Sequence, residues 1–292
     1  MKHRLKFRAV QCCCLMLFMF VAGRSAWALS AFEERLSSGL PDAPSVMAAN
    51  ASGTSKAGAE APLELQDHPR VTVVQVPVNM VQDGLHILIS PVYLRWHDAK
   101  WLVPMAGATA ATLATDTRTM TEVVSRNSSF NQTSVDVSNG LVGGMIAAPV
   151  ALFGFGIARR DERSREAGLL GSEAMADAYI VDQVVKLCAF RERPLVDNGQ
   201  GEFYIGSSGI DSSFISAHSM VAWSSAAVIA GEYRSKWVQL GVYAAAAGVS
   251  ATRVMGQQHF PSDVLLGAAG GWLIGHYVFR AHHHLPLEHR TK

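Results

Sequence analysis

Six long stretches with helical character and no set of strands between them follow Asp98, which limits the chain to an all-α fold. They cover residues 101–115, 141–158, 164–189, 217–233, 236–252 and 261–282. Asp98 and Ser138 are suited to cap the first two, because their side chains can accept hydrogen bonds from first-turn amides. The chain has no internal repeat and no heptad pattern. We therefore predict a helical bundle of about six helices.

The amino terminus has the features of an export signal. Residues 1–8 hold four basic side chains, residues 9–23 contain no charged residue, and Ala26-Trp27-Ala28 is typical of a cleavage site. The apolar stretch is shorter than the roughly 20 residues of a membrane span. We predict a signal peptide over residues 1–28 and a periplasmic or secreted protein. An uncleaved membrane anchor is the alternative.

The charge balance gives no sign of a nucleic-acid partner. The 292 residues include 25 basic and 24 acidic side chains, and cleavage after Ala28 would remove five basic ones and no acidic one. The remaining excess of acidic groups would not attract DNA or anionic lipid. Cleavage would also leave Cys188 as the single cysteine, so an internal disulfide is excluded.

Composition divides the rest of the chain into segments. Residues 29–70 include a stretch rich in Ser, Ala, Gly and Pro and are predicted to be a flexible linker. Residues 71–97 are predicted to form a mostly irregular arm, in which the β-branched run 71–78 is an edge strand or extended segment because it contains Pro77. The helical domain then covers residues 98–284, and residues 285–292 form a tail.

The first of three polar clusters contains Lys186 and Arg193, followed by Pro194. On a continuing helix, a separation of seven residues places both cations on one face, two turns apart. Two cations suit an anion with several oxygens, since Arg binds it as a planar fork and Lys as a point charge. A solvated basic helix end is the plain structural alternative.

The second cluster, Ser216-Ala217-His218, begins a predicted helix. Backbone amides and a Ser hydroxyl at a helix N-terminus can bind an anion, and a histidine beside them can transfer a proton near neutral pH. An ordinary N-cap serine followed by a chance histidine is the alternative.

The third cluster contains Arg253, His259 and Asp263. The last two are four residues apart and would share a helical face, so the carboxylate could hold one imidazole nitrogen. The other nitrogen would then serve as a nucleophile or base. A structural His–Asp contact would have the same spacing.

Taken together, Lys-x6-Arg-Pro, Ser-x-His and Arg-x5-His-x3-Asp resemble the type 2 phosphatidic acid phosphatase and vanadium-dependent haloperoxidase superfamily, over about residues 164–282. The resemblance implies a phosphatase with His259 as the nucleophile that forms a phosphohistidine, Asp263 as its orienting carboxylate and His218 as the general acid. It also implies a set of phosphate-binding residues: Lys186, Arg193, Ser216, Ala217 and Arg253.

Three positions depart from the family pattern. Ile215 and Ala217 flank Ser216 where the family has Pro and Gly, and Thr252 replaces a Ser before Arg253. Ala217 keeps its backbone amide but adds a Cβ atom, which disfavours positive φ. Every ionisable position of the pattern is retained, so we expect activity.

The resemblance implies hydrolysis without a metal or another cofactor, and vanadate is expected as an inhibitor. A haloperoxidase that uses vanadate as its cofactor, and a phosphate-binding protein without turnover, are the alternative functions. The partner is a phosphorylated small molecule or lipid, and the sequence indicates neither which one nor an oligomeric state. Glu173 and Asp177 share a helical face that we interpret as solvated, and His282-His283-His284 as a frayed helix end rather than a metal site.

Topology favours an exported bundle over a membrane-spanning enzyme. Several of the stretches have only about 15–17 apolar residues, and the helix predicted before Lys186 contains Glu173, Asp177 and Asp182. Three crossings after an exported start would also place the clusters in the cytoplasm. A hydrophobic hairpin near residues 85–94 would reverse that parity, so membrane association stays open.

Overall fold

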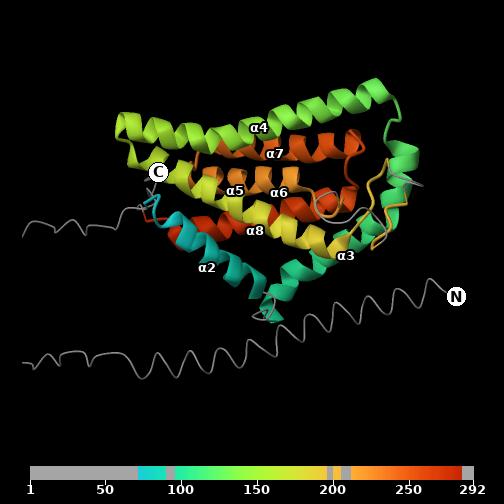
Figure 1. The fold of residues 1–292 in the computed structure, drawn as a ribbon, viewed down its shortest axis with the longest axis horizontal. Coiled ribbons are helices and arrows are strands. Elements are labelled where there is room, and N and C mark those ends of the chain that lie inside the picture. Colours follow the sequence, from blue (N-terminus) through green and yellow to red (C-terminus); the bar gives the residue numbers. More distant parts are fainter. Residues whose placement is uncertain (1–71, 90–95, 196–199, 205–211, 285–292) are drawn as a thin grey trace, which may run out of the picture. The chain divides into compact units, whose positions relative to one another are not determined.

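The computed structural model describes residues 72–89, 96–195, 200–204 and 212–284, all of which belong to the unit of residues 66–292. The predicted signal peptide, the linker and residues 285–292 lie outside the described residues. Within these ranges the chain forms α-helices and no strand, so the all-α prediction is confirmed (Figure 1). The helices are α2 (Val76–Ile89), α3 (Ala99–Arg118), α4 (Ser128–Arg159), α5 (Glu162–Ala189), α6 (Ala217–Glu232), α7 (Lys236–Met255) and α8 (Pro261–His282). A short 3-10 turn, Trp96–Asp98, precedes α3, and a π-helical turn, Thr119–Val123, follows it.

Helix α6 is the central helix of the bundle and packs against α4, α5, α7 and α8 (Figure 1). Glycines on α8 permit the closest of these approaches. A Cβ atom at Gly271 would lie 2.1 Å from the carbonyl oxygen of Met220, and one at Gly275 would lie 2.3 Å from that of Ser224. The spacing of four residues places both glycines on one face of α8. This close packing brings the amino-terminal ends of α6 and α8 together.

Two boundaries differ from the sequence prediction. Helix α4 begins at Ser128, where the Asn127 side chain accepts a hydrogen bond from the amide of Phe130, and not near residue 141. The predicted cap Ser138 instead lies buried within α4. Residues 72–78, the described part of the run predicted as an edge strand, form no strand, because α2 begins at Val76. Pro77 occupies the first turn, where its missing amide leaves no helical hydrogen bond unmade.

Two predictions of solvated polar residues are also wrong. Glu173 and Asp177 are buried in the bundle, 1% and 2% exposed, because α2 covers this part of α5. The carboxyl-terminal histidines are held in place and not frayed: His282 belongs to α8, and the amide of His284 donates to Glu166 Oε1 at 2.7 Å.

Helix α4 is distinguished by its apolar exterior. By length and composition it could cross a membrane, and it alone meets that condition among the described helices. Only 22% of its most apolar segment is buried, so it does not resemble the core helix of a soluble bundle. Large apolar side chains such as Val150, Phe155 and Ile157 are more than half exposed.

Candidate active site

The three polar clusters meet where α5 and α7 end and where α6 and α8 begin. His218 lies close to residues of all three clusters. Burial and four nearby cationic or imidazole groups together lower its pKa to about 4. In decreasing order of effect, those groups are Arg253, His259, Lys186 and Arg193. The structure thus brings together five ionisable residues that lie up to 73 positions apart in the sequence.

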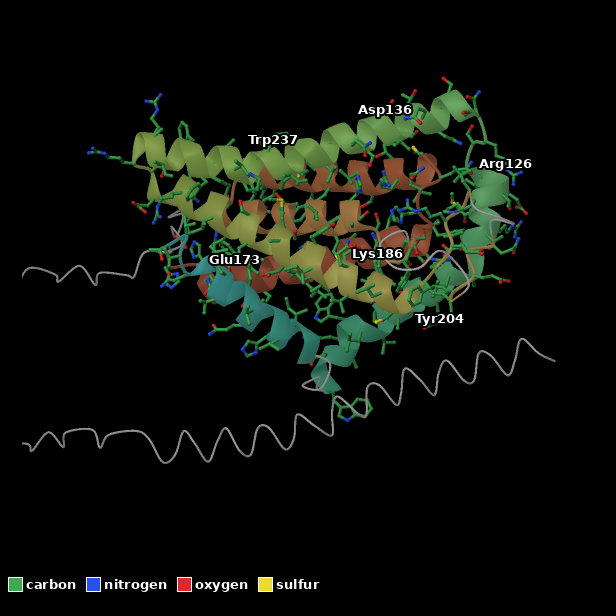
Figure 2. All side chains as sticks on the ribbon, viewed as in Figure 1. Arg126, Asp136, Glu173, Lys186, Tyr204 and Trp237 are labelled. Carbon is green, nitrogen blue, oxygen red and sulfur yellow. The ribbon has the colours of Figure 1, made fainter. Side chains whose placement is uncertain are left out.

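Lys186 and Arg193 reach the site from different local structures. Lys186 is buried on α5, with Nζ 3.1 Å from Oδ2 of Asp182 (Figure 2). The helix ends at Ala189, because Phe190 adopts a left-handed conformation with φ of 43°. Arg193 therefore lies in the following loop, and the prediction that both cations share one helical face is wrong. Its Nη1 donates to Oε1 of Gln258 at 3.2 Å, which ties this loop to the one before α8.

A third cation of the same segment, Arg191, was not singled out by the sequence analysis. Its guanidinium is buried, with Nη2 2.7 Å from Oδ2 of Asp116 and Nη1 2.5 Å from Oδ1 of Asp263. The same guanidinium lies over the ring of Phe260, 4.2 Å from its centroid. Arg191 thus connects α3, the loop after α5 and the start of α8.

Asp263 is engaged by several donors at once. Besides Arg191, its carboxylate accepts hydrogen bonds from Oγ of Ser213 at 2.5 Å and from the amide of Phe260 at 2.9 Å. His259 lies before α8, because that helix begins at Pro261. The prediction that His259 and Asp263 share a helical face is therefore wrong, although the two remain neighbours, with Nδ1 and Oδ2 3.7 Å apart.

The closest partner of His259 is a backbone carbonyl. Its Nδ1 lies 2.7 Å from the oxygen of Ser213, and a carbonyl oxygen can only accept, so Nδ1 holds the proton. In the neutral imidazole, Nε2 then carries the free electron pair. Burial, opposed by Asp263 and reinforced by Arg253 and Arg193, lowers the pKa of His259 to about 4, so the ring is neutral at pH 7.

Ser216 is the N-cap of α6, as predicted, and its Oγ accepts from the amide of Ser219 at 3.5 Å. The amide of Ser216 donates to the carbonyl of Asp263 at 3.2 Å and is thereby occupied. The next two amides, those of Ala217 and His218, have no hydrogen-bond partner among the residues the structure describes. Ala217 begins the helix and does not have a positive φ, so this position does not require glycine.

His218 is oriented by helix α4. Its Nε2 lies 3.1 Å from Oδ1 of Asn139. The departure at Thr252 has no consequence in this region, because the Thr252 hydroxyl donates to the carbonyls of Gly248 and Val249 in its own helix. It does not compete for any partner of Arg253.

Arg253 is the clearest sign of an anion site. The side chain is 6% exposed, and within the described part of the chain its Nε has no hydrogen-bond partner. Burial and the charge of Arg193 lower its pKa to about 10, so the guanidinium is still cationic at neutral pH. A buried cation with an unmade hydrogen bond beside a second cation is stabilised by an anion that accepts from both.

Comparison with known families agrees with this arrangement. Residues 168–286 match the PAP2 superfamily. This part of the chain belongs to the PAP2 superfamily. The PAP2 region runs from α5 past the end of α8 and contains every residue of the three clusters. No curated protein and no solved structure matches the chain.

A cavity of about 710 Å³ lies near the three polar clusters, between the end of α3 and helices α7 and α8. Val254 and Pro261 line it, and they are close neighbours along the chain of Arg253 and His259. Its lining is predominantly apolar and comprises Thr112, Thr119, Val123, Val124, Ser125, Phe130, Trp223, Ala247, Ser250, Ala251, Val254, Met255, Pro261, Val264, Leu265 and Ala268. This cavity has the size of a small-molecule site and suits an apolar group.

Proposed function

We propose that the chain is a phosphomonoesterase that transfers a phosphoryl group to His259 and then to water. Membership of the PAP2 superfamily indicates phosphatase-type activity. The observation that carries the finer proposal is the pairing of a neutral His259, whose Nε2 holds a free electron pair, with the buried and unsatisfied Arg253. One group supplies a nucleophile and the other a place for the charge of a phosphate.

In the first step, Lys186, Arg193 and Arg253 bind the phosphoryl oxygens together with the amides of Ala217 and His218. Nε2 of His259 attacks phosphorus, the P–N bond forms, and the P–O bond to the alcohol breaks. Protonated His218 gives its proton to the leaving oxygen. The three cations and the helix N-terminus stabilise the charge that spreads over the phosphoryl oxygens.

In the second step, His218 accepts a proton from water as the water oxygen attacks phosphorus. The P–N bond breaks, inorganic phosphate leaves, and His259 returns to its neutral form. The Nδ1–H group of His259 stays on the Ser213 carbonyl throughout, which keeps Nε2 as the reacting atom. This scheme uses only side chains and amides of the chain, and vanadate, which resembles the phosphoryl transition state, should inhibit it.

The apolar surroundings favour a lipid phosphate over a small soluble one. The cavity beside the site offers an apolar lining of a size that accommodates part of an acyl chain. The exposed apolar face of α4 supports contact with a membrane, where such a substrate resides. Together with the predicted amino-terminal signal, these features support an exported, membrane-associated phosphatase.

Phosphate release by the purified full chain tests this proposal. Wild type, His259→Ala and the control His276→Ala are compared on a long-chain lipid phosphate and on nitrophenyl phosphate. His276 is a second α8 histidine, stacked on Trp272 and outside the site. We expect release by wild type and the control, and none by His259→Ala with unchanged helicity.

Two results would contradict the proposal. Near-normal turnover by His259→Ala would remove His259 as the nucleophile. A folded wild type that binds phosphate without releasing it from either substrate would indicate a binding protein, and vanadate-dependent oxidation of halide by peroxide would indicate a haloperoxidase.

A further inference from the structure

A second buried polar cluster joins α2 to α5 and α8, away from the proposed phosphatase site. It contains Asp83 on α2, Glu173 on α5 and His282 on α8, with donor atoms that all lie within 4.8 Å of one another. Glu173 precedes Lys186 by 13 residues on α5, which separates the two groups by about 20 Å along the helix (Figure 2). The cluster is therefore distinct from the phosphate-binding residues.

The distances within the cluster are close to those between ligands of one metal ion. Nε2 of His282 lies 2.9 Å from Oδ2 of Asp83 and 3.7 Å from Oε1 of Glu173. Metal bonds of about 2.1 Å place neighbouring ligand atoms about 3.0–3.4 Å apart in octahedral or tetrahedral geometry. Small side-chain shifts would bring the three donors to one ion.

The Glu173 carboxylate shows that the cluster is incomplete as a hydrogen-bonded network. The residue is 1% exposed, and neither of its carboxylate oxygens has a hydrogen-bond partner among the described residues. Burial, followed by the nearby carboxylates of Asp83 and Asp177, raises the pKa of Glu173 to about 7, and the Asn79 side chain opposes this only in part. A buried carboxylate in this state is costly unless a cation is bound to it.

The charge of the surroundings points the same way. Asp177, 2% exposed, adds a third carboxylate whose Oδ2 is also unpartnered in the described part of the chain. No Lys or Arg in that part forms an ion pair with Asp83, Glu173 or Asp177. Even a protonated His282 leaves the cluster with an excess of negative charge when the carboxylates are ionised.

Helix α2 gives a reason for such a site. Along α2, Asp83 is the single fully buried side chain among those described, so the helix docks through a carboxylate rather than through a large apolar residue. Val76 and Ile87 contribute partly buried contacts. Burying the ionised Asp83 carboxylate in this position is unfavourable unless a bound cation compensates for the lost hydration free energy.

We infer that Asp83, Glu173 and His282 bind one divalent cation, with Asp177 beside them, and that the ion fixes α2 to α5 and α8. One imidazole with several carboxylates and no thiolate favours Zn²⁺ or Mn²⁺. Binding through Nε2 of His282 requires the other tautomer of the neutral ring, in which Nδ1 holds the proton that Nε2 now donates to Asp83. For His282, a role as metal ligand replaces the interpretation of the histidine tract as a frayed helix end rather than a metal site.

The test uses the full chain, without a histidine tag, stripped with a chelator and titrated with Mn²⁺ or Zn²⁺. Wild type, Glu173→Gln and Asp83→Asn are compared with two controls. Asp136→Asn makes the same change of a carboxylate to an amide at an exposed position of α4, and His284→Gln removes the neighbouring exposed histidine.

We expect wild type and both controls to bind one ion per chain and to unfold at a higher temperature when it is bound. Each cluster variant should bind about 100-fold more weakly or worse, because loss of a ligand costs at least as much as loss of the groups that orient ligands. Asp83→Asn keeps the test valid if Glu173→Gln perturbs the core, since α2 lies outside the bundle of α4 to α8.

Two outcomes would overturn the inference. One is a folded wild type that binds neither ion, which would mean that protons neutralise the carboxylates. The other is binding by Glu173→Gln and Asp83→Asn that equals wild type, which would place the ion elsewhere. Both readouts are independent of phosphate release, so failure of the proposed phosphatase activity would leave the result unaffected.

Discussion

Nη1 of Arg191 lies 2.5 Å from Oδ1 of Asp263, and the two side chains are 3% and 0% exposed. Asp116 completes the arrangement from α3, with Oδ2 2.7 Å from Nη2 of the same guanidinium. The carboxylate predicted to orient His259 is thus itself held by a buried cation and by Ser213. Arg191 consequently acts as a positioning residue for the turn that carries His259.

Replacing Arg191 by Met should destabilise the fold strongly. The change leaves Asp116 and Asp263 buried without their cation, and breaking a buried ion pair in this way costs about 3–5 kcal/mol. Unfolding by urea, followed by circular dichroism, measures the effect. The control is Arg118→Met, which breaks the exposed pair with Glu122 and should cost at most about 1 kcal/mol. Equal costs for both variants would show that Arg191 does not stabilise the fold through its ion pairs.

Sequence patterns predicted the helices well where periodicity and capping agreed, as at α6 and α8. They failed at α2. Its β-branched run favours an extended strand locally, whereas the helix is stabilised by contacts with α5 that no local pattern indicates. They also missed Asp116 and Arg191, since these residues meet across 75 positions of the chain. Asp116 is the single charged residue in the otherwise uncharged stretch before residue 117, and this isolated charge was the signal available in the sequence.

The site illustrates the same limit. The spacing of His259 and Asp263 predicted that they are neighbours, but for the wrong geometric reason, because Pro261 begins α8 after His259. The contact that determines the tautomer of His259 comes from the backbone of Ser213, and a backbone carbonyl has no sequence signature. Residue types led to the proposed chemistry, while the fold determines which atoms of these residues meet.

Replacing His218 by Asn should slow the reaction in a way that depends on the leaving group. An alkyl phosphate needs a proton on its leaving oxygen, so loss of the general acid should reduce kcat by about 100-fold to 10,000-fold. Nitrophenolate leaves without a proton, so nitrophenyl phosphate should lose less than about tenfold. Steady-state kinetics with both substrates measure the contrast. Equal losses on the two would assign His218 to phosphate binding alone.

The pH dependence of kcat/KM should have an acidic maximum with an alkyl phosphate. Burial lowers the pKa values of both His259 and His218 to about 4 in the free enzyme. As the pH falls through about 4, His259 gains a proton and loses its nucleophilic electron pair. As the pH rises above about 4, His218 loses the proton it must donate. The product of the two required forms is therefore largest near pH 4.

Rates measured between pH 3 and 8 check this expectation. With nitrophenyl phosphate, which needs no general acid, the decline on the alkaline side should be much weaker, and His218→Asn should abolish what remains of it. An alkyl-phosphate maximum at or above pH 7 would contradict the assignment of His218 as the acid.

Replacing Ala251 by Phe should discriminate against long-chain lipid phosphates. Ala251 lies on the exposed side of α7 and lines the apolar cavity, so a larger side chain fills the cavity without disturbing the core. Excluding two methylene groups from an apolar site costs about 1.6 kcal/mol at ~0.8 kcal/mol each, which corresponds to a rise in KM of about 15-fold. Nitrophenyl phosphate has no chain to exclude, so its KM should stay unchanged. Ala244→Phe is the matched control, since this residue is also exposed, lies two turns earlier on the same face and does not line the cavity. Two results would contradict binding of the lipid chain in the cavity: a rise in KM for both substrates in Ala251→Phe, or a rise in KM for the lipid in both variants. Either result would favour a small soluble substrate.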